Sequence, residues 1–334
     1  MIRIGLLGAG SMAGLYADRI AAMPDVTVAA VASPNSAPDF VAEHVPTATA
    51  YADADELCAH DALDAVAVLT PTHLHRSGVE TAAAAGLDVI CEKPIARTLE
   101  DASAIQRAVE DHGITFLTAH VVRFFPAYAT AHERVMAGDV GTPGVARTRR
   151  AFGHAGPRGW YDDHDASGGV LLDLAIHDFD YLRWVLGDVQ TVFTRHVEWG
   201  DAGVSEVALS VLRFAAGAVG HVESWWVEVP SVPFSTAFEF AGDEGLLEYD
   251  LDDVQPIRTF DEKAVHVPRD PVGHDVPLDR DGYRRQLDHF VDCVAGDADP
   301  AVPVDEGIRS LRLALAAIAS GQRGEPVAPA EVTP

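Results

Sequence analysis

The chain has 334 residues, of which 48% are hydrophobic, and it carries a formal net charge of −27. This charge would repel nucleic acid and anionic membranes, so we expect neither as a partner. No apolar run is long enough to span a membrane, and the N-terminus lacks a signal-peptide pattern, which together predict a cytoplasmic protein.

The basic residues are almost all arginines, since only Lys93 and Lys263 among the 24 basic residues are lysines. An acidic, lysine-poor surface suits a high-salt cytoplasm, so we expect a halophilic source. A GC-rich genome would also replace lysine by arginine, but it would not by itself produce the acidity. Lys263 lies in an acidic stretch and is interpreted as a solvated loop residue. Lys93 is the better candidate for chemistry, because an ammonium can share its proton and a guanidinium cannot.

The length predicts two domains, and strands alternate with helices in the first of them, residues 1–122. The predicted strands cover residues 2–7, 26–32, 65–69, 87–91 and 114–117, and the predicted helices cover residues 15–23, 77–85 and 100–112. This alternation predicts an α/β domain with a doubly wound parallel sheet, the Rossmann arrangement.

A glycine-rich turn joins the first predicted strand to the first helix. Gly8 permits a tight turn, Gly10 lets a pyrophosphate approach the backbone, and Ala13 lets helix and strand pack closely. The helix N-terminus offers unpaired N–H groups to phosphate. A plain tight turn is the alternative, but the position between strand and helix favours dinucleotide binding.

The end of the second predicted strand bears on which dinucleotide binds. NAD-binding proteins usually carry a carboxylate there for the ribose hydroxyls, whereas this chain has Ser33, Pro34 and Asn35. No arginine stands there to hold a 2′-phosphate either. Ser33 and Asn35 can hydrogen-bond either form, so the cofactor is predicted as NAD or NADP, with NADP slightly favoured.

Two further strand ends carry polar residues. Thr70 and Pro71 follow one strand, and Glu92, Lys93 and Pro94 follow the next. Ligands of parallel sheets bind beyond the carboxyl ends of the strands. We therefore expect Lys93 to face the cofactor.

The second half, residues 123–323, reads as an α+β domain built on a large, mostly antiparallel sheet. Its predicted strands are 144–152, 189–198, 204–214, 218–229, 234–241 and 245–249, and its predicted helices are 125–137, 283–295 and 305–320. We expect residues 250–281 to be mostly loop and the tail, residues 324–334, to be disordered.

A glycine pair, Gly168 and Gly169, opens a predicted helix that contains Asp173 and His177. A spacing of four places these two side chains on one helix face, beside the apolar stripe. A histidine next to a carboxylate is a natural proton acceptor. A surface Asp–His pair is an equally favoured alternative. Asp178 and Asp180 fall on other faces and are interpreted as solvated or structural.

Over nearly its whole length, the chain resembles the Gfo/Idh/MocA oxidoreductases, a family that includes inositol and glucose dehydrogenases. The resemblance rests on the segments 8–13, 70–75, 92–94, 123–126 and 168–177. The Glu-Lys-Pro triplet followed some 80 residues later by Asp-x-x-x-His is the specific part of it. The resemblance implies hydride transfer between NAD(P) and a secondary hydroxyl of a sugar, cyclitol or derivative.

The resemblance also implies a role for each matching residue. Lys93 would orient the reacting hydroxyl, His177 would act as acid and base, and Asp173 would hold substrate hydroxyls, with a cis peptide before Pro94. The implied cofactor contacts are Gly8, Gly10, Ser11, Met12, Ala13, Thr70, Pro71, His75, Glu92 and Lys93. The substrate side would add Arg123, with His154, Trp160 and Tyr161 on a loop that could reach it.

Other functions stay open on the sequence. A non-catalytic dinucleotide or sugar sensor of the same fold is one alternative, and hydrolysis through a retained NAD is another. Cys58, Cys91 and Cys293 show no metal-ligand spacing, so we expect no metal. We expect a homo-oligomer, a dimer or tetramer, because Trp225, Trp226 and Phe240 predict an apolar open sheet face.

Overall fold

The computed structural model describes residues 1–154, 159–199, 205–251, 257–261, 265–266 and 281–334, and it divides into two compact units. The first unit comprises residues 1–124 and 277–309, and the second comprises residues 125–276 and 310–333. The first unit ends at Phe124, two residues beyond the predicted boundary, and the predicted second domain, residues 123–323, is divided between the two units. Residues 277–309 return to the first unit, and Lys263 lies outside the described residues.

The first unit contains one six-stranded parallel sheet in the order β3-β2-β1-β4-β5-β6. Its strands are β1 (Ile2–Leu7), β2 (Val26–Ala32), β3 (Thr49–Tyr51), β4 (Ala65–Val68), β5 (Asp88–Glu92) and β6 (Phe116–Ala119). The strand order runs outward in both directions from β1 and β4, which confirms the doubly wound Rossmann fold. The carboxyl ends of β1, β4 and β5 are neighbours in this order, so the segments that follow them share one edge.

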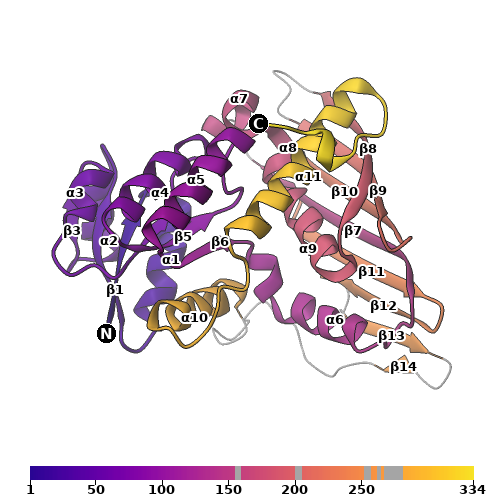
Figure 1. Cartoon of the computed structure of the whole chain (residues 1–334), viewed down its shortest axis with the longest axis horizontal. Coiled ribbons are helices and arrows are strands. Elements are labelled where there is room, and N and C mark those ends of the chain that lie inside the picture. Colours follow the sequence, from indigo (N-terminus) through magenta and orange to yellow (C-terminus); the bar gives the residue numbers. More distant parts are fainter. Residues whose placement is uncertain (155–158, 200–204, 252–256, 262–264, 267–280) are drawn as a thin grey trace. The chain divides into compact units, whose positions relative to one another are not determined.

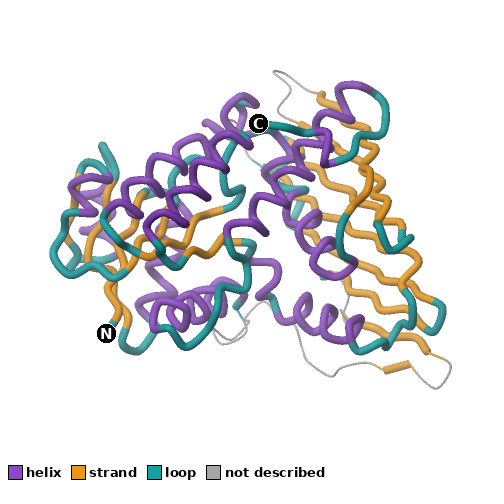
Figure 2. The backbone as a smooth tube through the Cα atoms, viewed as in Figure 1, coloured by secondary structure: helices purple, strands orange, loops and turns teal. Residues whose placement is uncertain are grey.

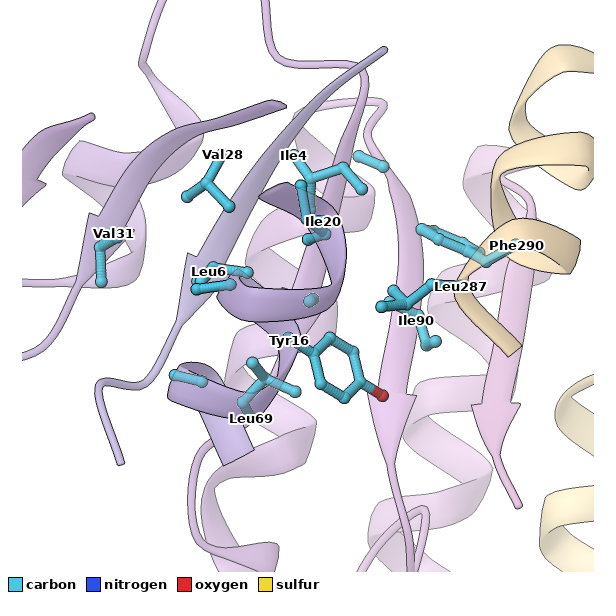
Figure 3. Packing of buried hydrophobic residues seen from close by; sticks show 14 of the residues in the cluster. Ile4, Leu6, Tyr16, Ile20, Val28, Val31, Leu69, Ile90, Leu287 and Phe290 are labelled. Atoms are coloured by element: carbon cyan, nitrogen blue, oxygen red, sulfur yellow. The ribbon is translucent and has the colours of Figure 1, made fainter. Parts of the chain in front are cut away.

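Helices cover both faces of this sheet. They are α1 (Ser11–Ala21), α2 (Ala37–His44), α3 (Ala54–Cys58), α4 (His75–Ala84), α5 (Leu99–His112) and α10 (Gly282–Ala295), with 3-10 turns η1 (Thr72–Leu74) and η2 (Val121–Phe124). Figure 3 shows α1 and α10 on the face that buries Leu6 and Ile90. Leu287 and Phe290 of α10 are fully buried there, which explains why α10 belongs to this unit.

The second unit is built on an eight-stranded sheet in the order β14-β13-β12-β11-β7-β10-β9-β8. Its strands are β7 (Pro143–Gly153), β8 (Val189–Trp199), β9 (Ser205–Phe214), β10 (Val219–Val227), β11 (Ser235–Gly242), β12 (Gly245–Asp250), β13 (Ile257–Asp261) and β14 (Val265–His266). All pairs are antiparallel except β7 with β10, which confirms the mostly antiparallel sheet. The prediction that residues 250–281 are mostly loop missed β13 and β14.

Helices pack on one face of this second sheet (Figures 1 and 2). They are α6 (Pro126–Met136), α7 (His164–Ser167), α8 (Gly169–Asp173), α9 (Ile176–Leu186) and α11 (Val304–Arg323, which begins in the first unit), with 3-10 turns η3 (Gly159–Asp162) and η6 (Pro329–Glu331). Trp226 and Phe240 are fully buried on the helix-covered side, so the expectation that they mark the open face is wrong. The open face instead exposes Leu209 and Val211 of β9, whose even-numbered neighbours point inward.

The C-terminal tail is ordered, contrary to the sequence-based expectation. Val192 and Val327 exchange backbone hydrogen bonds of 2.9 Å in both directions, and Val327 is fully buried. The Ser320 hydroxyl also donates to the Glu325 carbonyl at 2.6 Å. Helix α11 ends at Arg323, Gly324 follows it with φ +71°, and the tail then pairs with β8 through Val327. Within the described ranges no helix has the length and apolar character needed to cross a membrane.

Candidate active site

The glycine turn after β1 contains two glycines with different structural needs. Gly8 has φ +116°, and a Cβ there would lie 2.7 Å from the Leu69 carbonyl oxygen. The fold itself therefore requires Gly8. Gly10 has φ −94°, and a Cβ there would meet nothing within 4 Å. The space beside Gly10 is open, as a site for a ligand that approaches the backbone requires.

The start of α1 has the properties of a phosphate site. No side chain caps the helix at Gly10, and its first turn contains no acidic residue. Ser11 and Met12 supply the first helical N–H groups, and Ala13 is fully buried against the sheet. Unpaired N–H groups at the N-terminus of an eleven-residue helix favour an anion. The residues present thus fit the pyrophosphate of a dinucleotide.

The end of β2 offers only neutral groups. Ser33 and Ser36 hydroxyls lie 2.8 Å apart, and the Ser33 N–H donates to the Tyr51 carbonyl at 3.2 Å. Asn35 is exposed beside them. Residues 33–36 thus present neither a carboxylate for ribose hydroxyls nor an arginine for a 2′-phosphate.

The loop after β5 carries Lys93, which is partly exposed and followed by a cis peptide bond to Pro94. Glu92, by contrast, is buried. Its carboxylate accepts from the Tyr16 hydroxyl at 3.1 Å and from the Lys93 N–H at 3.2 Å, and Gln286 Nε2 donates to Tyr16 at 3.0 Å. Burial, and then the Glu92 charge, raise the pKa of Tyr16 well above its usual value, so Tyr16 remains a hydrogen-bond donor.

Glu92 is thereby a support of the lysine loop, whatever it contributes to a ribose. Sequence reasoning did not find Tyr16 or Gln286 as its partners. The available signal was Tyr16 itself, a side chain with a polar tip on the apolar stripe of the helix that follows the glycine turn.

A buried histidine connects the two loops that follow β4 and β5. His75 Nε2 lies 2.9 Å from the Thr70 carbonyl oxygen, and Nδ1 lies 2.9 Å from that of Pro94. Burial lowers the pKa of His75 to about 4, although the carbonyl contacts oppose that shift. A neutral ring carries one N–H, so it donates to one carbonyl at a time. The two ring nitrogens of His75 thus connect the loop that follows β4 to the loop that follows β5. A contact between His75 and nicotinamide stays a prediction.

The Thr70 hydroxyl oxygen is buried and has no hydrogen-bond partner among the described residues. Pro71, next to it, is partly exposed. An orphaned hydroxyl at the carboxyl edge of the sheet is the kind of group that a bound molecule satisfies. Thr70 and Gly10 are thus two independent features that fit a cofactor at this edge.

Arg123, at the end of the first unit, is buried. Its guanidinium donates to the Glu306 carboxylate at 2.9 Å. This ion pair ties η2 to the first turn of α11 within the first unit. A role for Arg123 in substrate binding stays a prediction.

Asp173 and His177, in the second unit, are the partly exposed positions of a buried segment. From Gly169 to Arg183 every residue is buried except these two. The continuous helix predicted from Gly168 is wrong, because α8 ends at Asp173 and α9 begins at Ile176. The Ala175 N–H bonds to the Val170 carbonyl five residues back, so the regular spacing of four does not relate the two side chains.

The residue next to His177 anchors α9 to the sheet. Arg150 of β7 forms two hydrogen bonds to Asp178, of 2.9 and 3.1 Å, and a third of 3.2 Å to Tyr128. Burial raises the pKa of Asp178, and the charge and hydrogen bonds of Arg150 oppose that shift. Asp180 accepts from Ser310 at 2.8 Å. Both aspartates are therefore structural. The sequence allowed either a structural or a solvated role, and their burial excludes the solvated one.

The other predicted substrate contacts occupy the segment between β7 and α7. His154 is buried, and its N–H donates to the Val227 carbonyl at 2.9 Å. Trp160 and Tyr161 stack on each other with ring centroids 4.1 Å apart. No group of three or more metal-ligating side chains occurs in the described part of the chain.

Two family models match the chain. The model described as "Oxidoreductase family, NAD-binding Rossmann fold" matches residues 2–120, and the model described as "Oxidoreductase family, C-terminal alpha/beta domain" matches residues 132–328. Both belong to the Gfo/Idh/MocA family, and together they cover most of the chain.

Individual relatives agree with these models over nearly full length. The scyllo-inositol 2-dehydrogenase (NAD(+)) of Bacillus subtilis is 27% identical, with 98% of this chain and 96% of the relative covered. The D-xylose 1-dehydrogenase (NADP(+)) 2 of Haloferax volcanii is 29% identical, with 90% and 91% covered. The crystal structure of a probable dehydrogenase from Thermotoga maritima superimposes with a TM-score of 0.84 at 27% identity, covering 99% and 100%. The chain is a member of the Gfo/Idh/MocA family of oxidoreductases.

Proposed function

We propose that this oxidoreductase transfers a hydride between NAD(P) and a secondary hydroxyl of a sugar, cyclitol or related polyol, with Lys93, Asp173 and His177 as its catalytic residues. The observation that carries the proposal is that Asp173 and His177 alone are partly exposed in a segment that is otherwise buried from Gly169 to Arg183. A second is that Lys93 directly follows β5, at the carboxyl edge of the first sheet where the neighbouring strand β4 also ends.

The proposed chemistry divides an alcohol oxidation into a proton and a hydride. The cofactor, when bound, accepts the hydride from the carbinol carbon. His177 takes the hydroxyl proton, Lys93 donates a hydrogen bond to the same oxygen and stabilises its developing negative charge, and Asp173 holds a neighbouring hydroxyl. The products are a ketone or lactone, the reduced cofactor and one proton on His177. Reduction runs the same steps backward.

For the cofactor we propose NAD or NADP, with NADP slightly favoured. The support is the neutral end of β2, where Ser33 and Asn35 stand instead of a carboxylate. The two relatives named above carry NAD(+) and NADP(+) in their respective names, so the family accommodates both.

We further propose that the protein is a homo-oligomer. From the acidic, lysine-poor composition we also propose a cytoplasmic location and a halophilic source. Four exposed apolar residues support it, since cross-strand pairing puts Val197, Leu209, Val211 and Val219 on one face of the second sheet. An apolar face of this kind is normally covered in the assembled protein.

The experiment that tests the function measures reduction of NAD and of NADP in molar KCl with a panel of cyclitols, aldoses and sugar acids. We expect native turnover, and we expect Lys93→Met to lower kcat by a factor of about 10²–10³ while the dinucleotide still binds. Dinucleotide binding without turnover of any panel member would contradict the proposed dehydrogenase and favour a sensor of the same fold. Lys263→Met is the matched control, because it removes the other lysine.

A further inference from the structure

A buried carboxylate lies beneath the segment that carries Asp173 and His177. Glu206 is the second residue of β9, and its side chain is only 1% exposed. It begins the inward-facing row of that strand, which continues through Ala208, Ser210 and Leu212. A carboxylate in such a row is costly to bury unless several donors surround it.

Three donors from three elements surround Glu206. Oε2 accepts from the Val170 N–H at 3.0 Å and from His196 Nε2 at 2.9 Å, and Oε1 accepts from His164 Nε2 at 3.0 Å. Burial raises the pKa of Glu206, but the bonds from His196 and Val170 and the interaction with His164 outweigh burial and lower the pKa overall. The carboxylate is therefore held ionised by its neighbours.

The same carboxylate explains the second glycine of the Gly168–Gly169 pair. Gly169 has φ +66°, and a Cβ there would lie 2.7 Å from Glu206 Oε2. The close backbone approach that the sequence indicated at this pair is thus made by Glu206 of the chain itself. A side chain at residue 169 would displace the carboxylate.

Val170 connects Glu206 to the interruption between α8 and α9 through hydrogen bonds of its N–H and its carbonyl group. Its N–H is fixed by Glu206, and its carbonyl oxygen accepts from Leu174 at 3.0 Å and from Ala175 at 2.8 Å. Those two hydrogen bonds define the irregular turn that separates Asp173 from His177. The backbone between the two proposed catalytic residues is therefore tied to β9 through one residue.

We infer that Glu206, oriented by His164 and His196, is a positioning residue that sets the geometry of Asp173 and His177. Only the expected effect on kcat rests on the proposed function; the expected effect on the backbone does not. Glu206 makes its contacts within the second unit. It therefore acts on Asp173 and His177 and leaves the proposed dinucleotide site of the first unit unchanged. Small displacements of catalytic groups cost large factors in rate, so the restraint has a kinetic readout.

The test uses the full-length protein and measures amide hydrogen exchange of residues 168–178, the dinucleotide Kd, and kcat. Glu206→Gln keeps the size but presents an NH2 to one of the three donors. We expect exchange in that segment to rise about tenfold or more and kcat to fall about tenfold, with the dinucleotide Kd unchanged. The matched control is Glu239→Gln, a carboxylate of β11 in the same sheet whose partner is Arg147 of β7, and it should change none of the three.

A second pair of variants separates positioning from loss of fold. His196→Gln retains an N–H donor near the position of Nε2, whereas His196→Leu removes it, so the former should restore most of the protection that the latter loses. Unchanged exchange and kcat in Glu206→Gln would overturn the inference, as would equal effects of His196→Gln and His196→Leu. Exchange needs no turnover, so it decides the inference even if the native protein oxidises no polyol.

Discussion

Replacing Asp178 by asparagine is expected to destabilise the second unit strongly. Arg150 and Asp178 side chains are 7% and 0% exposed, and they form a bidentate pair between β7 and α9. Asp178→Asn removes the negative charge and leaves the guanidinium buried. The Tyr128 hydroxyl, 3.2 Å away, and the rings of Tyr128 and Phe234, with centroids 5.8 and 6.0 Å from the guanidinium carbon, stay beside it.

The magnitude follows from the charges and their burial. Two unit charges roughly 4 Å apart attract by about 4 kcal/mol at an effective dielectric constant of about 20. Asparagine returns one neutral acceptor, worth about 1 kcal/mol. The expected loss is therefore about 3 kcal/mol, within the range of about 3–5 kcal/mol typical of a broken buried pair. Arg150→Met with Asp178→Leu removes both charges and is expected to lie within about 1 kcal/mol of the native protein.

The assay is urea unfolding followed by tryptophan fluorescence. All five tryptophans lie between residues 160 and 226, so the signal reports on the second unit. Because His177 precedes Asp178, kcat should fall together with stability in the single variant. A loss below about 1 kcal/mol for Asp178→Asn would refute the reasoning, as would a double variant no more stable than the single one.

Two further predictions concern the first unit. Gly10→Ala should leave the free energy of unfolding within about 0.5 kcal/mol of native but weaken dinucleotide binding in calorimetry, whereas Gly8→Ala should lower both; equal stability losses would contradict the assignment of open space at Gly10. His75 has a folded pKa of about 4, below its unfolded value, so the unfolded state binds the proton first and stability should fall as the pH drops from about 6.5 to 4. That fall should amount to about 3 kcal/mol and flatten in His75→Gln, and an unchanged slope would contradict the burial of a neutral ring.

The first domain was predictable because each part of it carries a local pattern. Short apolar strands alternate with helices, and Gly8 marks the turn where the backbone must have a positive φ. The return of α10 to this unit was not predictable. Its amphipathic pattern shows that Leu287 and Phe290 must be buried, but a pattern within one helix does not say against which sheet.

The second domain shows where local patterns mislead. Residues 168–186 have a continuous helical periodicity, yet the helix is interrupted between Asp173 and Ile176. The Val170 carbonyl accepts there from two successive N–H groups, those of Leu174 and Ala175. Trp225 and Trp226 alternate between the two sides of β10, and sequence alone did not decide which side the helices cover. The predicted strand bounds were nonetheless close to the observed ones. Alternation of apolar and polar residues identifies a strand, but it does not say which of its two faces points inward.

The largest gap concerns the carboxylates, and composition is its cause. In a chain with 51 acidic residues, any one carboxylate is most simply interpreted as solvated. Among the described residues the buried ones are Glu92, Asp178, Asp180 and Glu206. Glu92 bonds the Lys93 N–H, Asp178 follows His177, Asp180 lies in the same helix, and Glu206 fixes Val170. Each buried carboxylate thus supports a segment that carries a proposed catalytic residue. This pattern exists only in three dimensions, where burial separates four structural charges from a surface of similar ones.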